Sequence, residues 1–366
     1  AGGNADGNGI GDYMYSVPSG FLAPCSANLA TPAVKKPTEH FNIATYTGDA
    51  SSEGSGDEQA ITGVGFQPDF VWLKARSTGA NHLLHDVIRG PTKFIRSDTT
   101  DAEGTQAEGL KSFDSDGFTV GDSNAWNQNS RTLVAWNWKA GGSGSANNSG
   151  DINATVSANP TAGFSIVSWT GNSSNGDTIA HGLGKVPSVI FYKNREASSL
   201  IYVVTTAIDG SQDYLALGST TFAAASTWGA PATNTISNWT FGANDIIAYV
   251  WAEIEGFSKF GSYEGNGNAA GPFVNTGFRP AYVMLKSADA TYSWRIIDNK
   301  RNPYNVMDDG LWADLSNAES ASTSNLLDFY SNGFKLRGSG NGTNKSGDTY
   351  LYMAFAEFPF KYANAR

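Results

Sequence analysis

The sequence predicts an all-β protein made of three tandem antiparallel β-sandwich units, with jelly-roll-like or lectin-like layering. Two observations concern composition: the 366 residues include 42 glycines, and charged residues make up only 16% while aromatic residues reach 12%. The third is a strand motif that occurs three times. Many turns between aromatic and β-branched segments are typical of β proteins rather than of helical or disordered chains.

The motif consists of Gly, a Pro three residues later, and an apolar run closed by Lys. Its copies lie at residues 65–74, 184–193 and 277–286. The apolar run is β-branched and aromatic, which predicts a buried strand. Gly and Pro mark the preceding turn, because Pro cannot donate to a central ladder. We expect the closing lysine to reach solvent with its stem on apolar surface.

Further strands flank each copy. An aromatic segment ending in a glycine turn precedes the motif at residues 41–49, 164–172 and 260–266. An alternating strand closes each unit at residues 133–138, 247–252 and 350–355. Because the order of blocks is shared, we expect two sets of equivalent positions. They are the strand-end lysines Lys74, Lys193 and Lys286, and the core aromatics Trp136, Trp251 and Phe355.

Two smaller signals recur between the first and third units. An aspartate follows an apolar strand twelve residues after the lysine, as Asp86 and Asp298, where the second unit has Thr205. Asp-Gly at 116–117 and Asn-Gly at 332–333, each between apolar residues, predict β-hairpins. Repeats of about a hundred residues indicate tandem domains rather than a short-period solenoid.

These blocks divide the chain into units at residues 39–140, 162–256 and 257–366. Residues 141–161 are rich in Gly, Ser and Asn and are expected to form a flexible linker. Almost no linker separates the second and third units, so we expect these two to pack tightly. The leader, residues 1–38, is too short for a domain. It is either the last strand of an upstream domain, with 13–25 as strand and exit, or an arm that packs on a neighbour.

Charge and composition exclude several classes of protein. The net charge of −10 argues against binding to nucleic acid, whose phosphates require a Lys/Arg-rich surface. No apolar run approaches the roughly 18 residues of a membrane-spanning helix. Cys25 is the single cysteine, so an internal disulfide is excluded. The chain lacks an initiator Met and a signal-peptide pattern, and we expect it to begin within a longer protein or after a cleavage.

His82, His85 and Asp86 lie within five residues and form the first candidate site, as metal ligands or a general base pair. On a strand, the two histidines point to opposite faces because side chains alternate. The third unit keeps the aspartate but has Trp294 and Ile297 at the histidine positions. Structural roles are therefore favoured for all three.

Two acidic segments resemble fragments of calcium sites, since Ca²⁺ prefers oxygen ligands. Residues 98–104 contain three carboxylates in a loop, but their spacing is not that of an EF-hand. Residues 114–117 have a counterpart at 330–333 that keeps the turn and loses the first carboxylate. A solvated loop and a hairpin are the favoured interpretations, so no metal site is assigned.

Four tryptophans in polar segments are candidates for glycan or subunit contact: Trp126, Trp228, Trp239 and Trp312. An aromatic ring packs on the apolar C–H face of a sugar while neighbouring amides bind its hydroxyls. The favoured alternative is that these rings cover the core or bury against a neighbouring subunit.

Enzymatic signals are weak. The sequence lacks a Gly-x-Ser-x-Gly elbow and a phosphate-binding loop, so we expect no enzyme activity and assign no catalytic residue and no cofactor. A pair of glycosidase carboxylates stays open, because sequence does not fix their separation.

The motif set resembles a domain repeated in structural proteins of tailed bacteriophages, especially marine phages. The resemblance rests on the aromatic strand leading to Thr47-Gly48 and on residues 65–74, 83–90, 110–121 and 129–138. It covers nearly the whole chain, and the second unit departs most. The leader segment 13–29 is similar to the closing segment of the SPRY or concanavalin-like domain that often precedes this domain.

The resemblance implies a non-enzymatic virion component, such as a tail fibre, appendage or capsid-surface protein, located on the virion surface or outside the cell. Its partners would be copies of itself, other virion proteins and host-surface glycans, and phage fibres favour a homotrimer. The rival interpretations are a carbohydrate-binding module or glycoside-acting enzyme, and a bacterial surface-filament subunit whose arms donate strands between subunits.

Overall fold

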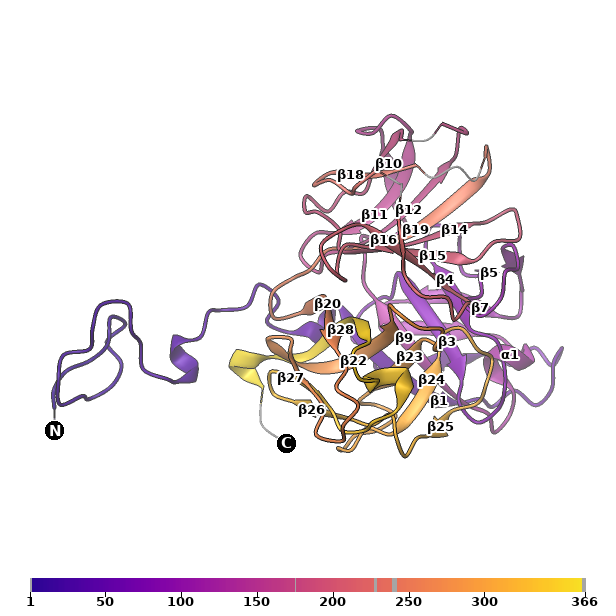
Figure 1. Cartoon of the computed structure of the whole chain (residues 1–366). Helices are drawn as coiled ribbons and strands as arrows, with labels where there is room; N and C mark the ends of the chain where they lie inside the picture. Colours follow the sequence, from indigo (N-terminus) through magenta and orange to yellow (C-terminus); the bar gives the residue numbers. More distant parts are fainter. Residues whose placement is uncertain (1, 175, 227–228, 239–241, 364–366) are drawn as a thin grey trace.

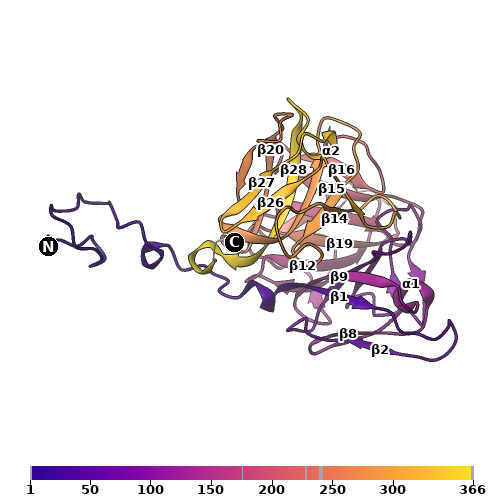
Figure 2. The ribbon, with the colours of Figure 1, turned by 90° about the horizontal axis from the view of Figure 1, so that it is seen from below.

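The computed structural model describes residues 2–174, 176–226, 229–238 and 242–363 (Figure 1). The all-β prediction is confirmed, because within these described residues 28 strands are joined by turns and the two α-helices span four residues each. Among the described residues, no helix is long and apolar enough to cross a membrane. Apart from an N-terminal arm, the strands gather into one body with three units (Figures 1 and 2).

The first unit has a large sheet of order β1-β9-β3-β4 and a small sheet of order β2-β8-β7. Its elements are β1 (Phe41–Thr47), β2 (Gln59–Ile61), β3 (Phe70–Ala75), β4 (Leu83–Asp86), β5 (Lys93–Phe94), β6 (Gly104–Thr105), β7 (Leu110–Asp114), β8 (Gly117–Val120), α1 (Asn124–Asn127) and β9 (Thr132–Trp138). β3 is buried along its whole length, as its continuous apolar run predicts. The Asp116-Gly117 hairpin forms as expected, joining β7 to β8.

The second unit has a large sheet of order β10-β11-β12-β19-β14-β15-β16-β17 and a small sheet of β13 and β18. Its strands are β10 (Ser145–Asn147), β11 (Ala154–Asn159), β12 (Phe164–Thr170), β13 (Thr178–Ala180), β14 (Val189–Asn194), β15 (Ile201–Thr205), β16 (Asp213–Leu217), β17 (Ala224–Ala225), β18 (Thr235–Ser237) and β19 (Asp245–Trp251).

The expectation of a flexible linker at residues 141–161 is wrong. β10 and β11 lie within it and extend the large sheet, with Thr155 paired to Ser168 of β12. Although the segment is polar overall, apolar residues alternate within it, and Ala154 and Val156 point to the apolar interior of the second unit.

The third unit has a large sheet of order β20-β28-β22-β23-β24-β25 and a small sheet of order β21-β27-β26. Its elements are β20 (Ser258–Glu264), β21 (Phe273–Asn275), β22 (Phe278–Ser287), β23 (Arg295–Asp298), β24 (Asp309–Trp312), β25 (Ser320–Ala321), β26 (Leu327–Tyr330), β27 (Gly333–Leu336), α2 (Asn341–Asn344), β28 (Thr349–Pro359) and the short 3₁₀ turn η3 (Phe360–Tyr362). Asn332-Gly333 forms its predicted hairpin between β26 and β27.

Pro280 departs from its expected role as turn punctuation, because it lies inside β22. The register between β22 and β28 shifts on both sides of this residue, which marks a bulge. A bulge is one of the few places where a strand tolerates proline, since the ladder hydrogen bond is already interrupted there.

The same four-strand order recurs in the large sheets, as β1-β9-β3-β4, β12-β19-β14-β15 and β20-β28-β22-β23. The motif lysines match in register: Lys74 pairs with Val134, Lys193 with Ile247 and Lys286 with Leu351. These three partners hold the same place in β9, β19 and β28. The units therefore share topology and register across their central strands.

The same registers correct the predicted set of core aromatics. Trp136, Trp251 and Phe355 are all buried, but Trp136 does not match the other two. The first residues of β1, β12 and β20 pair with Trp138, Trp251 and Phe355, so Trp138 is the equivalent residue. Trp136 lies two residues earlier and corresponds to Tyr249. The closing strand of the first unit carries tryptophans two apart on one face, and sequence order alone could not choose between them.

Each unit has an apolar interior between its large and small sheets. A fourth cluster is shared by all three units, on the other face of the large sheets. Within it the ring of Phe41 stacks on Phe355 with centroids 5.0 Å apart, and Phe70 stacks on Tyr249 at 4.2 Å. The units are therefore parts of one body with a shared core, rather than separate domains joined by linkers.

The leader divides into two parts. Residues from Val34 onward belong to the body, since Val34 is buried in the shared cluster and the 3₁₀ turn η2 (Pro37–Glu39) packs against β1 and β28. Residues 2–31 form an arm that extends away from the body in both views (Figures 1 and 2). It contains the short 3₁₀ turn η1 (Ser26–Asn28).

The strand predicted within residues 13–25 is absent from the arm as described, where Tyr13 makes a single bridge to Asn4. Asp6 organises this segment instead. Its carboxylate accepts the N–H groups of Ala23, Ile10 and Asn8, and the Nδ2 of Asn28. These hydrogen bonds, led by that from Ala23, lower the pKa of Asp6 to about 2. A carboxylate hub holds the arm as a compact loop.

Candidate functional site: the interfaces between units and the arm

The three motif lysines are buried rather than at solvent, which overturns the expectation from sequence. Each ammonium group donates to backbone carbonyls of a neighbouring unit. Lys74 Nζ reaches Asn317 O at 2.8 Å in the third unit, Lys193 Nζ reaches Thr100 O at 3.3 Å in the first, and Lys286 Nζ reaches Thr220 O at 3.1 Å in the second. Each unit thus holds the one before it in a cyclic order.

Carbonyls of the lysine's own unit complete each cage. Lys74 also donates to Ala75 O at 2.8 Å, and Lys286 donates to Ser287 O at 2.9 Å and Ala290 O at 3.1 Å. Burial is the largest influence on these amines and lowers the pKa of each to about 8. The hydrogen bonds to these carbonyls offset the free-energy cost of removing the ammonium group from water.

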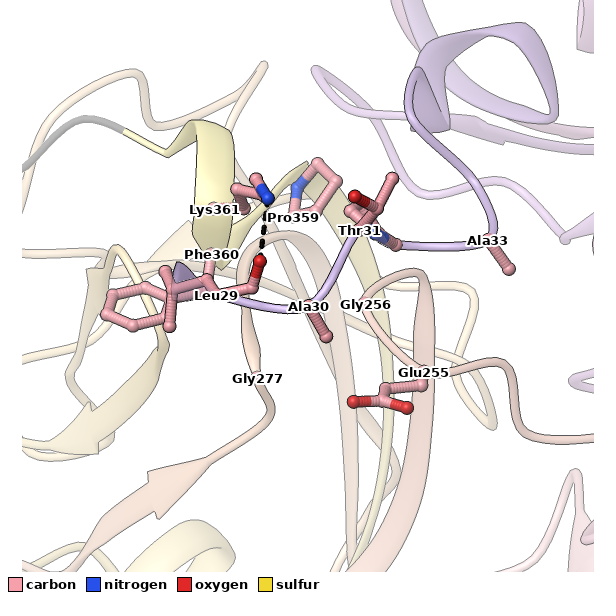
Figure 3. Close-up of a pocket in the computed structure, with 11 residues that line it drawn as sticks. Leu29, Ala30, Thr31, Ala33, Glu255, Gly256, Gly277, Pro359, Phe360 and Lys361 are labelled. Carbon is pink, nitrogen blue, oxygen red and sulfur yellow. Dashed lines mark hydrogen bonds between the residues drawn. The ribbon is translucent and has the colours of Figure 1, made fainter. Parts of the chain in front are cut away.

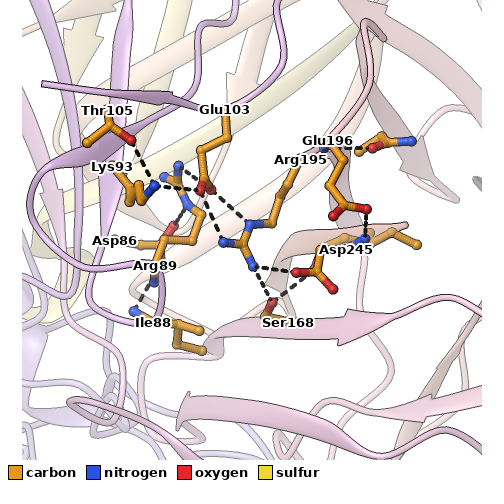
Figure 4. A network of polar contacts seen from close by, with 12 residues as sticks. Asp86, Ile88, Arg89, Lys93, Glu103, Thr105, Ser168, Arg195, Glu196 and Asp245 are labelled. Atoms are coloured by element: carbon orange, nitrogen blue, oxygen red, sulfur yellow. Dashed lines mark hydrogen bonds and ion pairs between the residues drawn. The ribbon is translucent and has the colours of Figure 1, made fainter. Parts of the chain in front are cut away.

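A charged network lies between the first and second units (Figure 4). Asp86 and Arg89 form a fully buried ion pair, and Arg89 also lies 3.5 Å from Glu103. Glu103 receives a bidentate contact from Arg195 of the second unit, at 2.8 and 3.1 Å. Tyr249 of the second unit donates its hydroxyl to Asp86 at 2.8 Å. Five side chains from two units therefore form one connected polar cluster.

The network recurs between the third and first units. Asp298 pairs with Arg301 at 2.6 Å, and Arg301 contacts Glu319 at 2.8 Å. Arg76 of the first unit binds Glu319, and Trp136 of the first unit donates its indole N–H to Asp298 at 3.0 Å. Position by position, this set repeats the one around Asp86, with Trp136 in the place of Tyr249.

The interface between the second and third units has no such charges at the corresponding positions. Thr205 replaces the aspartate, as its pairing with Val189 across the sheet shows, and Ile208 follows where the arginine stands. Ala223 and Ala288 replace the glutamate and the second arginine. Ala223 N–H donates to Ala288 O at 2.8 Å, matching Glu103 to Arg195 and Glu319 to Arg76 at the same distance.

The fifth position changes in step with the other four. Met353 of the third unit stands in register where Trp136 and Tyr249 donate to their aspartates. All charged or donating members of the set are thus absent together at this interface. A buried network that has lost only some of its members leaves polar groups without partners and destabilises the fold. The five positions are therefore expected to change together.

His82 and His85 are structural in this fold, on opposite faces of the strand as expected. His82 accepts from Trp72 Nε1 at 2.8 Å and contacts Trp312 O of the third unit at 2.8 Å. His85 accepts from Trp126 Nε1 at 2.9 Å inside the first unit. Burial lowers the pKa of both histidines to about 3, so both rings are neutral. Within the described ranges no group of three or more His, Cys, Asp or Glu side chains is arranged to hold a metal.

The four candidate tryptophans have different outcomes. Trp126 is 3% exposed and lies in the interior of the first unit, which contradicts its candidate role in glycan or subunit contact and agrees with the favoured alternative that the ring covers the core. Trp312 is half-buried under the guanidinium of Arg295, 5.9 Å from its ring centroid, and its carbonyl serves the contact between units. Trp228 and Trp239 lie outside the described residues.

The arm leaves the body beside an apolar pocket of about 380 Å³ (Figure 3). Pro32 and Gly256 line it together with the segment from Pro359 to Lys361. Lys361 Nζ donates to Leu29 O at 2.6 Å, the bond drawn in the figure, and ties the arm to the end of the third unit. Beyond this anchor the arm exposes large apolar side chains. They are Met14 at 76%, Tyr15 at 80%, Phe21 at 68% and Leu22 at 47%.

Comparison with known proteins gives one match. A family model described as a domain of unknown function, DUF7483, matches residues 36–359, and the chain belongs to this family. The matched range begins in the part of the leader that packs on the body and ends with β28, so it comprises the three units. No curated protein matches the chain. No solved structure matches it either.

Proposed function

We propose that this member of the DUF7483 family is a non-enzymatic structural subunit of a virion, of the tail-fibre, appendage or capsid-surface class. Its body is a rigid block, and its arm attaches that block to another copy or to a neighbouring virion protein. The observation that carries the proposal is the arm: an ordered segment outside the body that exposes four large apolar side chains, Met14, Tyr15, Phe21 and Leu22.

Exposed apolar groups gathered on one segment mark an interaction surface in soluble proteins. Hydrogen bonds to the Asp6 carboxylate join distant parts of the arm, and the hydrogen bond from Lys361 to Leu29 O ties the arm to the third unit. A preorganised arm lowers the entropy that association would otherwise cost, which suits permanent assembly.

The buried polar groups support the same proposal. The charged clusters around Asp86 and Asp298 and the three caged lysines join the units to one another. Charged side chains that are buried and hydrogen-bonded to a neighbouring unit keep the units rigidly joined. They have no access to a substrate and do not suit catalysis. A body fixed at all interfaces between its units is suited to carrying load.

Deletion of residues 1–28 tests the role of the arm. The truncation keeps Leu29 and the segment that packs on the body, so we expect its melting temperature to match that of the full chain. Light scattering should show self-association of the full-length protein, or binding to a virion protein, that the truncated protein loses. A matched variant, Met14→Ser with Phe21→Ser, keeps the arm and should weaken the same association.

The class of assembly has its own test. Mass spectrometry of purified phage particles should detect peptides of this chain in stoichiometric amount. Failure to find the chain in particles would overturn the virion assignment. A full-length protein that stays monomeric and binds no virion protein, with a truncation that behaves identically, would overturn the role of the arm.

A further inference from the structure

The outer face of the small sheet in the third unit combines aromatic and polar side chains. Strand alternation and register place Phe273 and Asn275 of β21 on this face, beside Lys335 of β27 and Asp328 and Tyr330 of β26. We call these five residues the aromatic face. Phe273 is 45% exposed and Tyr330 is 37% exposed.

The two rings form a fixed pair. Their centroids lie 6.0 Å apart at 73°, in an edge-to-face arrangement. Gly333 pairs with Asn275 on one side and Tyr330 on the other, and a Cβ there would clash with Val274 O and meet the Phe273 ring at 3.0 Å. Tyr330 donates its hydroxyl to Asp328 at 3.1 Å, and Arg337 pairs with the same carboxylate. The platform is therefore held in place by a glycine and an ion pair.

A second exposed aromatic stands beside this strand. Asn305 exchanges two hydrogen bonds of 2.9 Å with the backbone of Phe329, on the free edge of β26. Its neighbours Tyr304 and Val306 are 78% and 41% exposed. Two exposed apolar side chains therefore flank the residue that binds the edge of this sheet.

The first unit shows that the fold does not need these rings. Gly117 and Gly333 occupy the same place in the two hairpins, so Asp114 corresponds to Tyr330 and Ala60 to Phe273. The same sandwich therefore forms with a carboxylate and a methyl group at these positions. Aromatic rings that are exposed and dispensable for folding indicate a ligand.

We propose that the aromatic face binds carbohydrate, with a sugar ring packed on Phe273 and Tyr330. Aromatic rings contact the apolar C–H face of a pyranose, while the amide of Asn275 and the ammonium of Lys335 donate to its hydroxyls. A protein partner would favour a broader patch depleted of Lys and Asp. The inference rests on the proposed function only in that the glycan would belong to the host surface.

Glycan-array screening of the full chain, with printed bacterial-surface oligosaccharides, followed by calorimetric titration of the strongest hit, tests this proposal. Two variants remove the rings one at a time: Phe273→Ala takes the residue of the first unit, and Tyr330→Ser removes the second ring without placing another carboxylate beside Asp328. Each should keep the melting temperature and weaken binding by about tenfold or more, since a stacked ring contributes roughly that much. Phe222→Ala, which removes a 54% exposed ring in the second unit, is the matched control and should bind normally.

The outcomes separate the two proposals. A sugar that binds the full chain and loses affinity in both variants supports the carbohydrate site even if the chain is absent from particles. An array without hits, or a hit whose affinity both variants retain, overturns the site and leaves the virion assignment untouched. Variants that instead abolish association with a virion protein would show that the face binds protein and overturn the carbohydrate proposal.

Discussion

The charged interface between the first and second units can be rewritten as its apolar counterpart. The perturbation replaces five side chains by those at the corresponding positions of the interface between the second and third units. The substitutions are Asp86→Thr, Arg89→Ile, Glu103→Ala, Arg195→Ala and Tyr249→Met. If the three interfaces are equivalent, this quintuple variant should fold and pack.

The magnitudes follow from burial. Arg89 and Asp86 have no exposed side-chain surface, so Arg89→Ile alone leaves the carboxylate of Asp86 buried without its cation and should lower the free energy of unfolding by about 3–5 kcal/mol. Replacing a complete buried ion network by apolar groups is often neutral or stabilising by about 1–4 kcal/mol. We therefore expect the quintuple variant to lie within about 2 kcal/mol of the native protein, well above the single variant.

Urea denaturation followed by tryptophan fluorescence measures both variants, with equal m-values required for comparison. Arg195→Ala together with Glu103→Ala is an intermediate control that removes the ion pair between Glu103 and Arg195 and leaves the Asp86–Arg89 pair and its hydrogen bond from Tyr249 intact. Two results would refute the reasoning: a mild effect of Arg89→Ile, or a quintuple variant that loses as much stability as the sum of its members. The second would show that the interfaces are not interchangeable.

Two further predictions concern stability. The pKa of Lys193 is about 8 in the folded chain and 10.5 in the unfolded chain, so the free energy of unfolding should rise with pH between these values. Lys193→Met should remove about a third of the rise that the three lysines produce together. An unchanged slope in pH-dependent denaturation would contradict burial of this amine. Trp251→Ala removes a ring from the shared cluster and should lower the free energy of unfolding by about 3–5 kcal/mol. The exposed control Phe222→Ala should change it by no more than about 0.5 kcal/mol. Equal melting temperatures for these two variants would refute the packing.

The amino-acid sequence alone was sufficient for the fold class, the central strands and the hairpins. Strand signals are local: the apolar run that becomes β3, the alternation that becomes β9 and the Asp116-Gly117 turn depend on neighbouring residues. Opposite faces for His82 and His85 followed from the same alternation. The choice between Trp136 and Trp138 did not, because both lie on one face of a strand and only pairing distinguishes them.

Tertiary structure decided how the units meet and therefore what the candidate residues do. Lys74 ends a strand and is expected at solvent from sequence, yet carbonyls more than two hundred residues away enclose its ammonium. Asp86 is an isolated carboxylate in the sequence and the acceptor of Tyr249 in the fold. Such contacts join distant segments, and their energy depends on desolvation that only the packed body creates. A local sequence pattern predicts strands, whereas the segments that pack over a charged side chain determine whether it is solvated or buried and paired.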